Sequence, residues 1–269
     1  MSHLMRPDTA AEQTPGAGRT DSLVIPSRFC GPPGSGHGGY VSGRIAAYVD
    51  GPATVILRQP PPLATPMTVE PAGGGSVRIR RGRTLIAEAS SALIRPALEI
   101  PGAVSLAEAN TVAGSAAYYT DPVFPDCVVC GTGRRPGDGL RILPGPLPGR
   151  PMWAAPWTPD ASVSDAQGTV RPEVIWAALD CPSGIAAAEA AGLAGDTAIL
   201  LGQMTASLAE LPVADDQCLV VAWPGARDGR KLRAGSALVG PGGKVLAAAS
   251  TVWLTVPRPV PVLSAGGAS

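Results

Sequence analysis

The amino-acid sequence predicts an α+β protein built from two similar halves, each with one helix followed by antiparallel strands. Three observations support this class. One segment of each half repeats apolar residues at helical spacing, strand-like runs follow that segment, and glycine and proline punctuate the elements as turns. At 269 residues the chain exceeds the usual domain size of roughly 100–150 residues, so two compact units are expected.

The first half should contain a helix from Tyr40 to about Val49. Val41, Ile45 and Val49 recur at helical spacing, and Asp50-Gly51-Pro52 supplies a stop signal. The alternation of apolar and charged residues after this helix is typical of half-buried antiparallel strands. These strands are predicted at residues 54–58, 67–70 continuing through 76–80, and 84–94.

The second half should repeat this order. A helix is expected to open at Val170-Arg171-Pro172-Glu173 and to reach Asp180-Cys181-Pro182, where Pro182 should kink or split it. Strands are then predicted at residues 197–201, 204–208, 218–223, 231–239 and 244–256.

A short sequence similarity also suggests a repeat. Residues 82–87 (Gly-Arg-Thr-Leu-Ile-Ala) resemble residues 229–234 (Gly-Arg-Lys-Leu-Arg-Ala), which indicates a period of roughly 130–140 residues. The predicted organisation is a disordered leader at 1–21, a first domain at 22–100, a Pro/Gly-rich linker at 101–150, a second domain at 151–258 and a tail at 259–269.

The composition excludes two classes of partner. Lys and Arg together number 21, as do Asp and Glu, and no basic stripe is interleaved with aromatic residues, so nucleic acid is not an expected partner. No stretch reaches the roughly 18–20 continuous apolar residues of a membrane span. The five cysteines are irregularly spaced, which favours a reducing cytoplasm.

One motif carries a family resemblance. His37-Gly38-Gly39, at the start of a helix that strands follow, resembles the hotdog-fold acyl-CoA thioesterases, especially the phenylacetate-pathway type. Cys127-Val128-Val129-Cys130-Gly131, followed by Gly137-Asp138-Gly139-Leu140, resembles a Cys-rich lead-in to some of those domains. The resemblance covers about residues 24–256. It implies a double hotdog, in which two long helices, each wrapped by an antiparallel sheet, pack as an intramolecular pseudo-dimer.

The family motif also implies which residues form the site. In that family an acidic residue follows the histidine by nine positions, and the dimer joins one chain's glycines to the other chain's carboxylate. Nine positions after His37 the sequence has Ala46, whereas Asp180 lies nine positions after Arg171. The first half therefore keeps the glycines and the second keeps the acid, which implies one composite site. The other pseudo-site, with Ala46 facing Arg171 and Pro172, should be inactive because proline has no N–H.

The chemistry expected of this site is thioester hydrolysis. Negative charge develops on the carbonyl oxygen, and backbone N–H groups of Gly38 and Gly39 at a helix N-terminus could stabilise it. Asp180 is the candidate general base or nucleophile, and its apolar neighbours predict burial that raises its pKa. Alternatively, Asp180 caps a second helical segment after Pro182. For His37 the alternatives are a role in the site or only orientation of the loop. For Gly38-Gly39 the alternative to an oxyanion site is a flexible turn.

Charged residues at predicted turns are candidates for substrate binding. Arg83, Arg230 and Lys231 could meet the phosphates of coenzyme A, although solvated strand ends are the favoured explanation of these residues. No cofactor is expected beyond the coenzyme A of the substrate.

The Cys127-x-x-Cys130 pair raises the question of a metal. A tetrahedral zinc site needs four ligands, no second Cys pair is present, and the only histidines are His3 and His37, so no metal site is predicted. A redox role is not expected, because the pair lies in the linker and not at the start of a helix.

The sequence therefore predicts a cytoplasmic acyl-CoA (or acyl-carrier) thioesterase. The alternative is a non-catalytic acyl-thioester binding protein of the same fold, and the third hypothesis is a structural or partner-binding protein. The fold further implies that the pseudo-dimer pairs into a homodimer.

Overall fold

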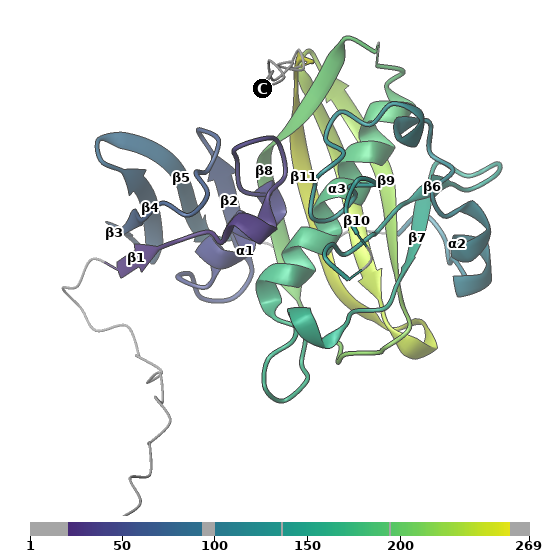
Figure 1. Ribbon diagram of the computed structural model, residues 1–269, viewed down its shortest axis with the longest axis horizontal. Coiled ribbons are helices and arrows are strands. Elements are labelled where there is room, and N and C mark those ends of the chain that lie inside the picture. The colour runs from purple at the N-terminus through teal and green to yellow at the C-terminus, as the bar shows by residue number, and fades with distance from the viewer. Residues whose placement is uncertain (1–20, 93–99, 136, 194, 259–269) are drawn as a thin grey trace, which may run out of the picture.

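A single antiparallel sheet organises the chain. The computed structural model describes residues 21–92, 100–135, 137–193 and 195–258 (Figure 1), so almost all of the expected leader and all of the tail lie outside the described residues. Within the described residues the sheet has eleven strands, in the order β1-β3-β4-β5-β2-β8-β11-β10-β9-β7-β6. The strands are β1 (Asp21–Leu23), β2 (Ala53–Leu57), β3 (Met67–Gly73), β4 (Ser76–Arg81), β5 (Thr84–Ser91), β6 (Gly145–Pro146), β7 (Trp153–Trp157), β8 (Thr197–Leu208), β9 (Cys218–Asp228), β10 (Lys231–Val239) and β11 (Val245–Pro257).

The strand order is mirrored about the pair β2–β8. On one side lie β2, β5, β4, β3 and β1, and on the other β8, β11, β10, β9 and β7, so each strand of the first half has a counterpart in the second. At the centre, Ala53 to Ile56 pair with Ala206 to Gln203, and the hydroxyls of Thr54 and Thr205 are 2.8 Å apart. The repeat predicted from the order of elements is therefore present in the topology.

The six-residue similarity, however, does not mark equivalent strands. Residues 82–87 open β5, whose counterpart is β11, whereas residues 229–234 open β10. Both segments begin with a two-residue hairpin loop, Gly82-Arg83 and Gly229-Arg230, and both glycines have positive φ (56° and 55°). Such loops require a backbone conformation that glycine adopts without strain, so the shared turn explains the resemblance.

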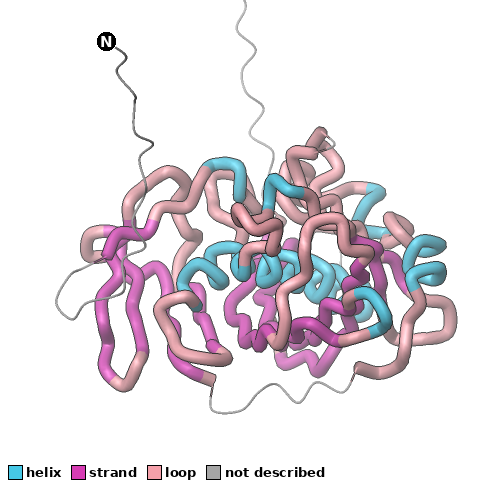
Figure 2. Tube along the Cα trace, turned by 90° about the horizontal axis from the view of Figure 1, so that it is seen from below, coloured by secondary structure: helices cyan, strands magenta, loops and turns pink. Residues whose placement is uncertain are grey.

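Two helices pack against each other on one face of the sheet (Figures 1 and 2). They are α1 (Gly38–Ala46) and α3 (Pro172–Ala190). Their backbones meet at two glycines of α1, because a Cβ on Gly39 would lie 2.7 Å from the Trp176 carbonyl oxygen and one on Gly43 would lie 2.5 Å from Glu173 Cα. Later positions in α1 thus contact earlier positions in α3, so the helices run antiparallel.

Pro182 does not split α3, so that part of the expectation was wrong. The helix continues to Ala190. Two carbonyls close to the proline receive hydrogen bonds from side chains: Leu179 O from the Ser236 hydroxyl and Asp180 O from the Ser183 hydroxyl, both at 2.7 Å. Most of α3 is buried, so packing on all sides holds the helix together where proline removes a donor.

The segment predicted as a linker contains ordered structure. It holds α2 (Leu106–Val112), a 3-10 turn (Ala117–Thr120) and β6, and α2 begins at a capping box of Ser105 and Glu108. The segment also packs on α3, because the Tyr118 N–H donates to the Glu189 carboxylate. Cys127, Val128, Val129 and Cys130 are all buried in the core. No described helix combines the length and the hydropathy needed to cross a membrane.

Candidate active site

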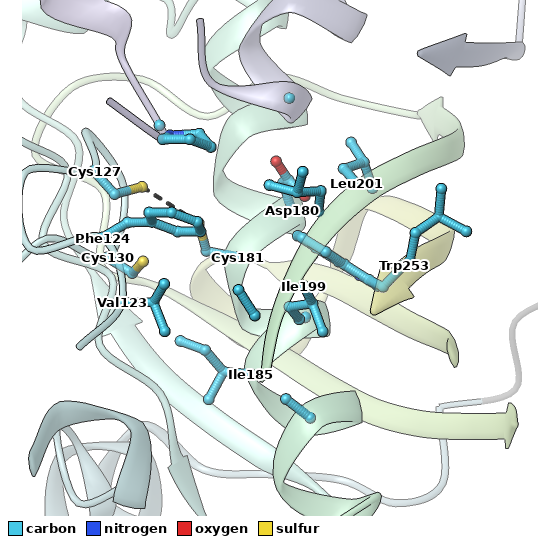
Figure 3. A pocket seen from close by; sticks show the side chains of 18 of the residues that line it. Val123, Phe124, Cys127, Cys130, Asp180, Cys181, Ile185, Ile199, Leu201 and Trp253 are labelled. Carbon is cyan, nitrogen blue, oxygen red and sulfur yellow. Dashed lines mark hydrogen bonds between the residues drawn. The ribbon is translucent and has the colours of Figure 1, made fainter. Parts of the chain in front are cut away.

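A cavity of about 850 Å³ opens between α1, α3 and the segment 117–130. Its walls come from both halves of the sheet, and Figure 3 shows the apolar side chains around it. The apolar lining includes Val123, Phe124, Ile185, Ile199, Leu201 and Trp253. His37, Gly38, Asp180 and Cys181 form a polar end of the same cavity. The cavity therefore has the composition of a pocket for a largely apolar ligand with one reactive group.

Asp180 meets the N-terminus of α1. Its Oδ2 accepts a hydrogen bond of 2.6 Å from the Gly39 N–H, while Oδ1 is buried without a hydrogen-bond partner among the described residues. The side chain is 2% exposed. Burial raises the pKa of Asp180 to about 6, against the opposing effects of His37 and the Gly39 N–H, as the sequence analysis predicted. Asp180 lies inside α3 rather than capping a second helix.

The two glycines differ in what their N–H groups contact. The Gly39 N–H is engaged by Asp180, whereas Gly38 lines the cavity and its N–H has no partner among the described residues. Both positions are crowded, because a Cβ on Gly38 would lie 3.0 Å from Leu201 Cβ and one on Gly39 would lie 2.5 Å from Asp180 Cβ. In this arrangement Gly38, and not the pair of glycines, offers a free donor to a ligand.

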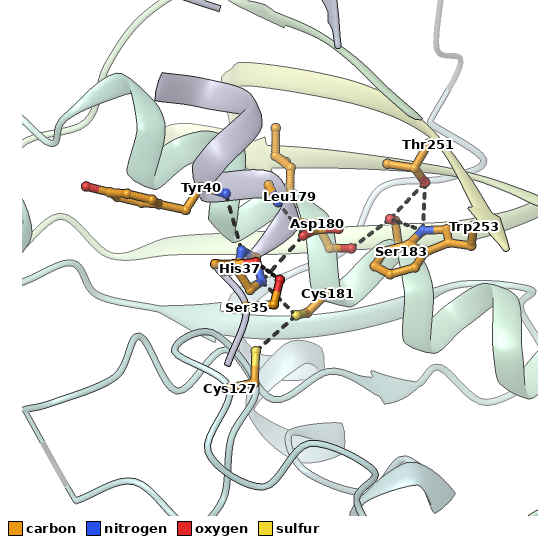
Figure 4. Close-up of polar contacts among 12 residues, drawn as sticks. Ser35, His37, Tyr40, Cys127, Leu179, Asp180, Cys181, Ser183, Thr251 and Trp253 are labelled. Carbon is orange, nitrogen blue, oxygen red and sulfur yellow. Dashed lines mark hydrogen bonds and ion pairs between the residues drawn. The ribbon is translucent and has the colours of Figure 1, made fainter. Parts of the chain in front are cut away.

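His37 caps α1 and also contacts the carboxylate (Figure 4). Its Nδ1 accepts the Tyr40 N–H at 3.2 Å, so in the neutral ring the hydrogen lies on Nε2. Nε2 is 3.4 Å from Asp180 Oδ2 and 3.1 Å from Cys181 Sγ. His37 therefore caps α1 and also lies beside Asp180.

The opposite pseudo-site lacks both features of the first. α1 ends at Ala46, which carries no carboxylate, and α3 begins at Pro172, which has no N–H. The Arg171 side chain is directed to the Ser162 and Ser164 carbonyls.

The structure does not place Arg83, Arg230 or Lys231 among the residues that line the cavity. They lie at the two hairpin loops, at strand ends, and the Arg230 Nε donates to the Thr255 carbonyl. Two other arginines line the cavity, each in an ion pair: Arg58 with Glu88 and Arg258 with Asp121, both at 2.8 Å. Sequence reasoning missed these arginines, because their place depends on how the strands assemble.

Three cysteines gather beside His37. The donor atoms of His37, Cys127 and Cys181 all lie within 4.8 Å of one another, and the sulfur atoms of Cys127 and Cys181 are 3.6 Å apart. Cys130, three residues after Cys127, is also buried. Hydrogen bonds from Cys130 and Cys181, together with His37, hold the pKa of Cys127 well below its usual range. The sequence analysis did not connect Cys181 with the Cys127-x-x-Cys130 pair.

Comparison with known proteins identifies the fold. No family model matches the sequence, and no curated protein matches it either. Two solved structures match along most of their length: a thioesterase candidate from Novosphingobium aromaticivorans (13% identity, 87% of this chain and 94% of that one, TM-score 0.54) and a candidate thioesterase II from Thermobifida fusca (11% identity, 87% and 91%, TM-score 0.57).

The chain has a hotdog fold, which it shares with these two structures. The resemblance inferred from His37-Gly38-Gly39 is thus confirmed at the level of the fold. At 11–13% identity the likeness carries no activity with it.

Proposed function

We propose that the chain hydrolyses an acyl thioester, of coenzyme A or of an acyl carrier, at one composite site between two hotdog halves. One observation carries the proposal: the buried carboxylate of Asp180, from the second half, is held 2.6 Å from a glycine N–H at the helix N-terminus of the first half, beside a largely apolar cavity. The mirrored strand order supports a double hotdog, with halves within residues 22–100 and 151–258.

The proposed reaction begins with the thioester carbonyl at the polar end of the cavity. Its oxygen accepts the free N–H of Gly38, where the positive end of the α1 dipole also favours the developing negative charge. The acyl group lies along the apolar wall that contains Leu201 and Trp253. Because the oxyanion donor is a backbone group at a helix start, it requires no rearrangement during the reaction.

Asp180 then acts in one of two ways. As general base it removes a proton from water, the hydroxyl adds to the carbonyl carbon, the C–S bond breaks, and the thiolate recovers the proton as a thiol. As nucleophile it attacks the carbonyl carbon directly, the C–S bond breaks and the thiolate leaves and is protonated by solvent, and water then hydrolyses the mixed anhydride to the free acid and the Asp180 carboxylate. In both cases the Gly39 N–H holds Oδ2, so Oδ1, which has no partner within the described residues, is the oxygen available to react.

Release of free thiol from a panel of short, medium, long and aromatic acyl-CoAs tests this function directly. Hydrolysis of at least one member is expected. If none is hydrolysed but acyl-CoA raises the melting temperature, the chain is an acyl-thioester binding protein, and if neither occurs, the hydrolase proposal fails together with the binding hypothesis.

Gly38 allows the oxyanion donor to be removed without breaking the helix. Gly38→Pro deletes the N–H and should leave the helix intact, because proline fits the first position of a helix and His37 already has the extended backbone (φ −63°, ψ 127°) that precedes proline. Gly38→Ala introduces the same crowding against Leu201 but keeps the N–H. We expect kcat of the proline variant to fall about 10²–10³-fold below that of the alanine variant. Equal rates for the two would exclude Gly38 as the donor.

A further inference from the structure

Three potential metal ligands, His37, Cys127 and Cys181, converge from segments that are distant in the sequence, and Cys130 lies three residues after one of them. Cys127 and Cys130 come from the segment between the halves, Cys181 from α3, and His37 from the N-terminus of α1. The His37 Nε2 is 3.1 Å from Cys181 Sγ, which is 3.6 Å from Cys127 Sγ (Figure 4). These separations suit neighbouring ligands of one ion, since ligands at roughly 2.0–2.3 Å in a tetrahedron lie between about 3 and 4 Å apart.

The Cys127-x-x-Cys130 pair lies in a turn whose shape fits this role. The Gly131 N–H donates to the Cys127 carbonyl at 2.9 Å, and a Cβ on Gly131 would lie 2.4 Å from that oxygen. The turn therefore depends on glycine immediately after the second cysteine. It is fixed from outside by the Leu140 N–H, which donates to the Val128 carbonyl at 2.7 Å. Both thiols are thereby held in the core, facing Cys181.

The remaining cysteines do not belong to this group. Cys30 Sγ contacts the Asp126 carbonyl and accepts from the Arg134 guanidinium. Cys218 begins β9. By contrast, Cys181 Sγ contacts both His37 Nε2 and Cys127 Sγ. The thiols of Cys127 and Cys181 and the imidazole of His37 surround one point, and the buried Cys130 is the nearest further thiol in the sequence; these are ligands that zinc prefers.

We propose that Cys127, Cys130, Cys181 and His37 bind one Zn²⁺ ion in a closed, structural site. Four protein ligands complete the tetrahedron, so the ion would support the fold instead of activating water. The ion would link the N-terminus of α1 to α3 and to the intervening segment, and so keep Gly38 next to Asp180. This inference does not depend on hydrolysis of a thioester.

Zinc binding changes protonation at the ligands. The thiols bind as thiolates and release their protons to solvent. The ion would bind the lone pair of His37 Nε2, so the ring hydrogen would lie on Nδ1. Nδ1 could then no longer accept the capping hydrogen bond from the Tyr40 N–H. One capping hydrogen bond is thus exchanged for four metal–ligand bonds.

The first test is metal content of the full chain, purified without added chelator, by mass spectrometry. About one zinc per chain is expected. Cobalt titration of the metal-free chain should then give the intense visible bands and sulfur-to-cobalt charge-transfer absorption of a tetrahedral thiolate site. A chain without zinc whose cobalt complex lacks these bands would overturn the proposal, as would a Cys127–Cys181 disulfide in the freshly purified protein.

Variants assign the ligands. Cys130→Ser and Cys181→Ser should each reduce bound zinc to well below one per chain and weaken the charge-transfer band, while Cys218→Ser serves as the matched buried control and should retain both. Circular dichroism before metal analysis checks that each variant is folded. Because the unmodified chain already gives a decisive cobalt spectrum, a ligand variant that fails to fold leaves the test intact. Full zinc in either ligand variant would contradict the assignment.

Discussion

Replacing Asp180 by asparagine is expected to lower kcat for acyl-CoA hydrolysis about 10²–10⁴-fold while the chain stays folded. Asparagine has the size of aspartate, and its carbonyl oxygen can still accept the Gly39 N–H that Asp180 Oδ2 accepts in this structure. What it lacks is a group that can take a proton from water or attack the carbonyl carbon. The measurement is thiol release under single-substrate steady-state conditions with the best acyl-CoA of the panel.

The control for this variant is Asp228→Asn, which makes the same chemical change at an exposed position at the end of β9. Its kcat should equal that of the unmodified chain. An Asp180→Asn variant that hydrolyses at the native rate would remove Asp180 from the mechanism. If the variant loses activity only because it unfolds, its lowered melting temperature will show this. The kinetic measurement is then made on Asp180→Glu, which keeps a carboxylate.

Gly43→Ala is expected to destabilise the chain by about 1–3 kcal/mol or more, because overpacking at a backbone contact cannot be relieved by a side-chain rotation. The added Cβ would lie 2.5 Å from Glu173 Cα and 2.9 Å from Trp176 Cβ. The two helices would have to separate, and that movement would also draw the Gly39 N–H away from Asp180. Chemical denaturation followed by tryptophan fluorescence measures the change in the free energy of unfolding.

Gly195→Ala is the matched control, since no atom lies within 4 Å of the position of its added Cβ. An exposed substitution of this kind normally changes stability by less than about 0.5 kcal/mol. A Gly43→Ala variant as stable as the Gly195→Ala control would mean that the helices approach less closely than described.

The periodic elements of the fold were predictable from the sequence. Alternation at residues 77–80 predicted β4, although the run expected from 67 through 80 forms two strands, β3 and β4, and the strand predicted at 231–239 is β10. The helix α1 was predicted from Val41 and Ile45, although it ends at Ala46 rather than near Val49. The offset between a histidine and an acid in the related family led to Asp180, which the structure indeed brings to Gly39.

Other parts of the site were beyond local sequence patterns. Cys181 lies 54 residues after Cys127, and only the fold shows that the segment between the halves turns back onto α3. β7 was missed because Trp153–Trp157 is buried on nearly every residue, so it shows no alternation. Arg83 and Arg230 were assigned to substrate binding for the opposite reason. The Gly-Arg turn in which each lies is a local pattern that occurs at tight hairpins whether or not a ligand is nearby.

The pairing of β2 with β8 has a consequence for synthesis of the chain on the ribosome. Thr54 and Thr205 are 151 residues apart, so β2 emerges long before its neighbour exists. At about 5–20 residues per second that interval is roughly 8–30 s. During this time the first half presents an unpaired strand edge, the kind of edge along which chains associate wrongly. This edge stays exposed until β8 is made. Premature termination after the first half would therefore release an aggregation-prone fragment that contains Gly38 and Gly39 but lacks Asp180.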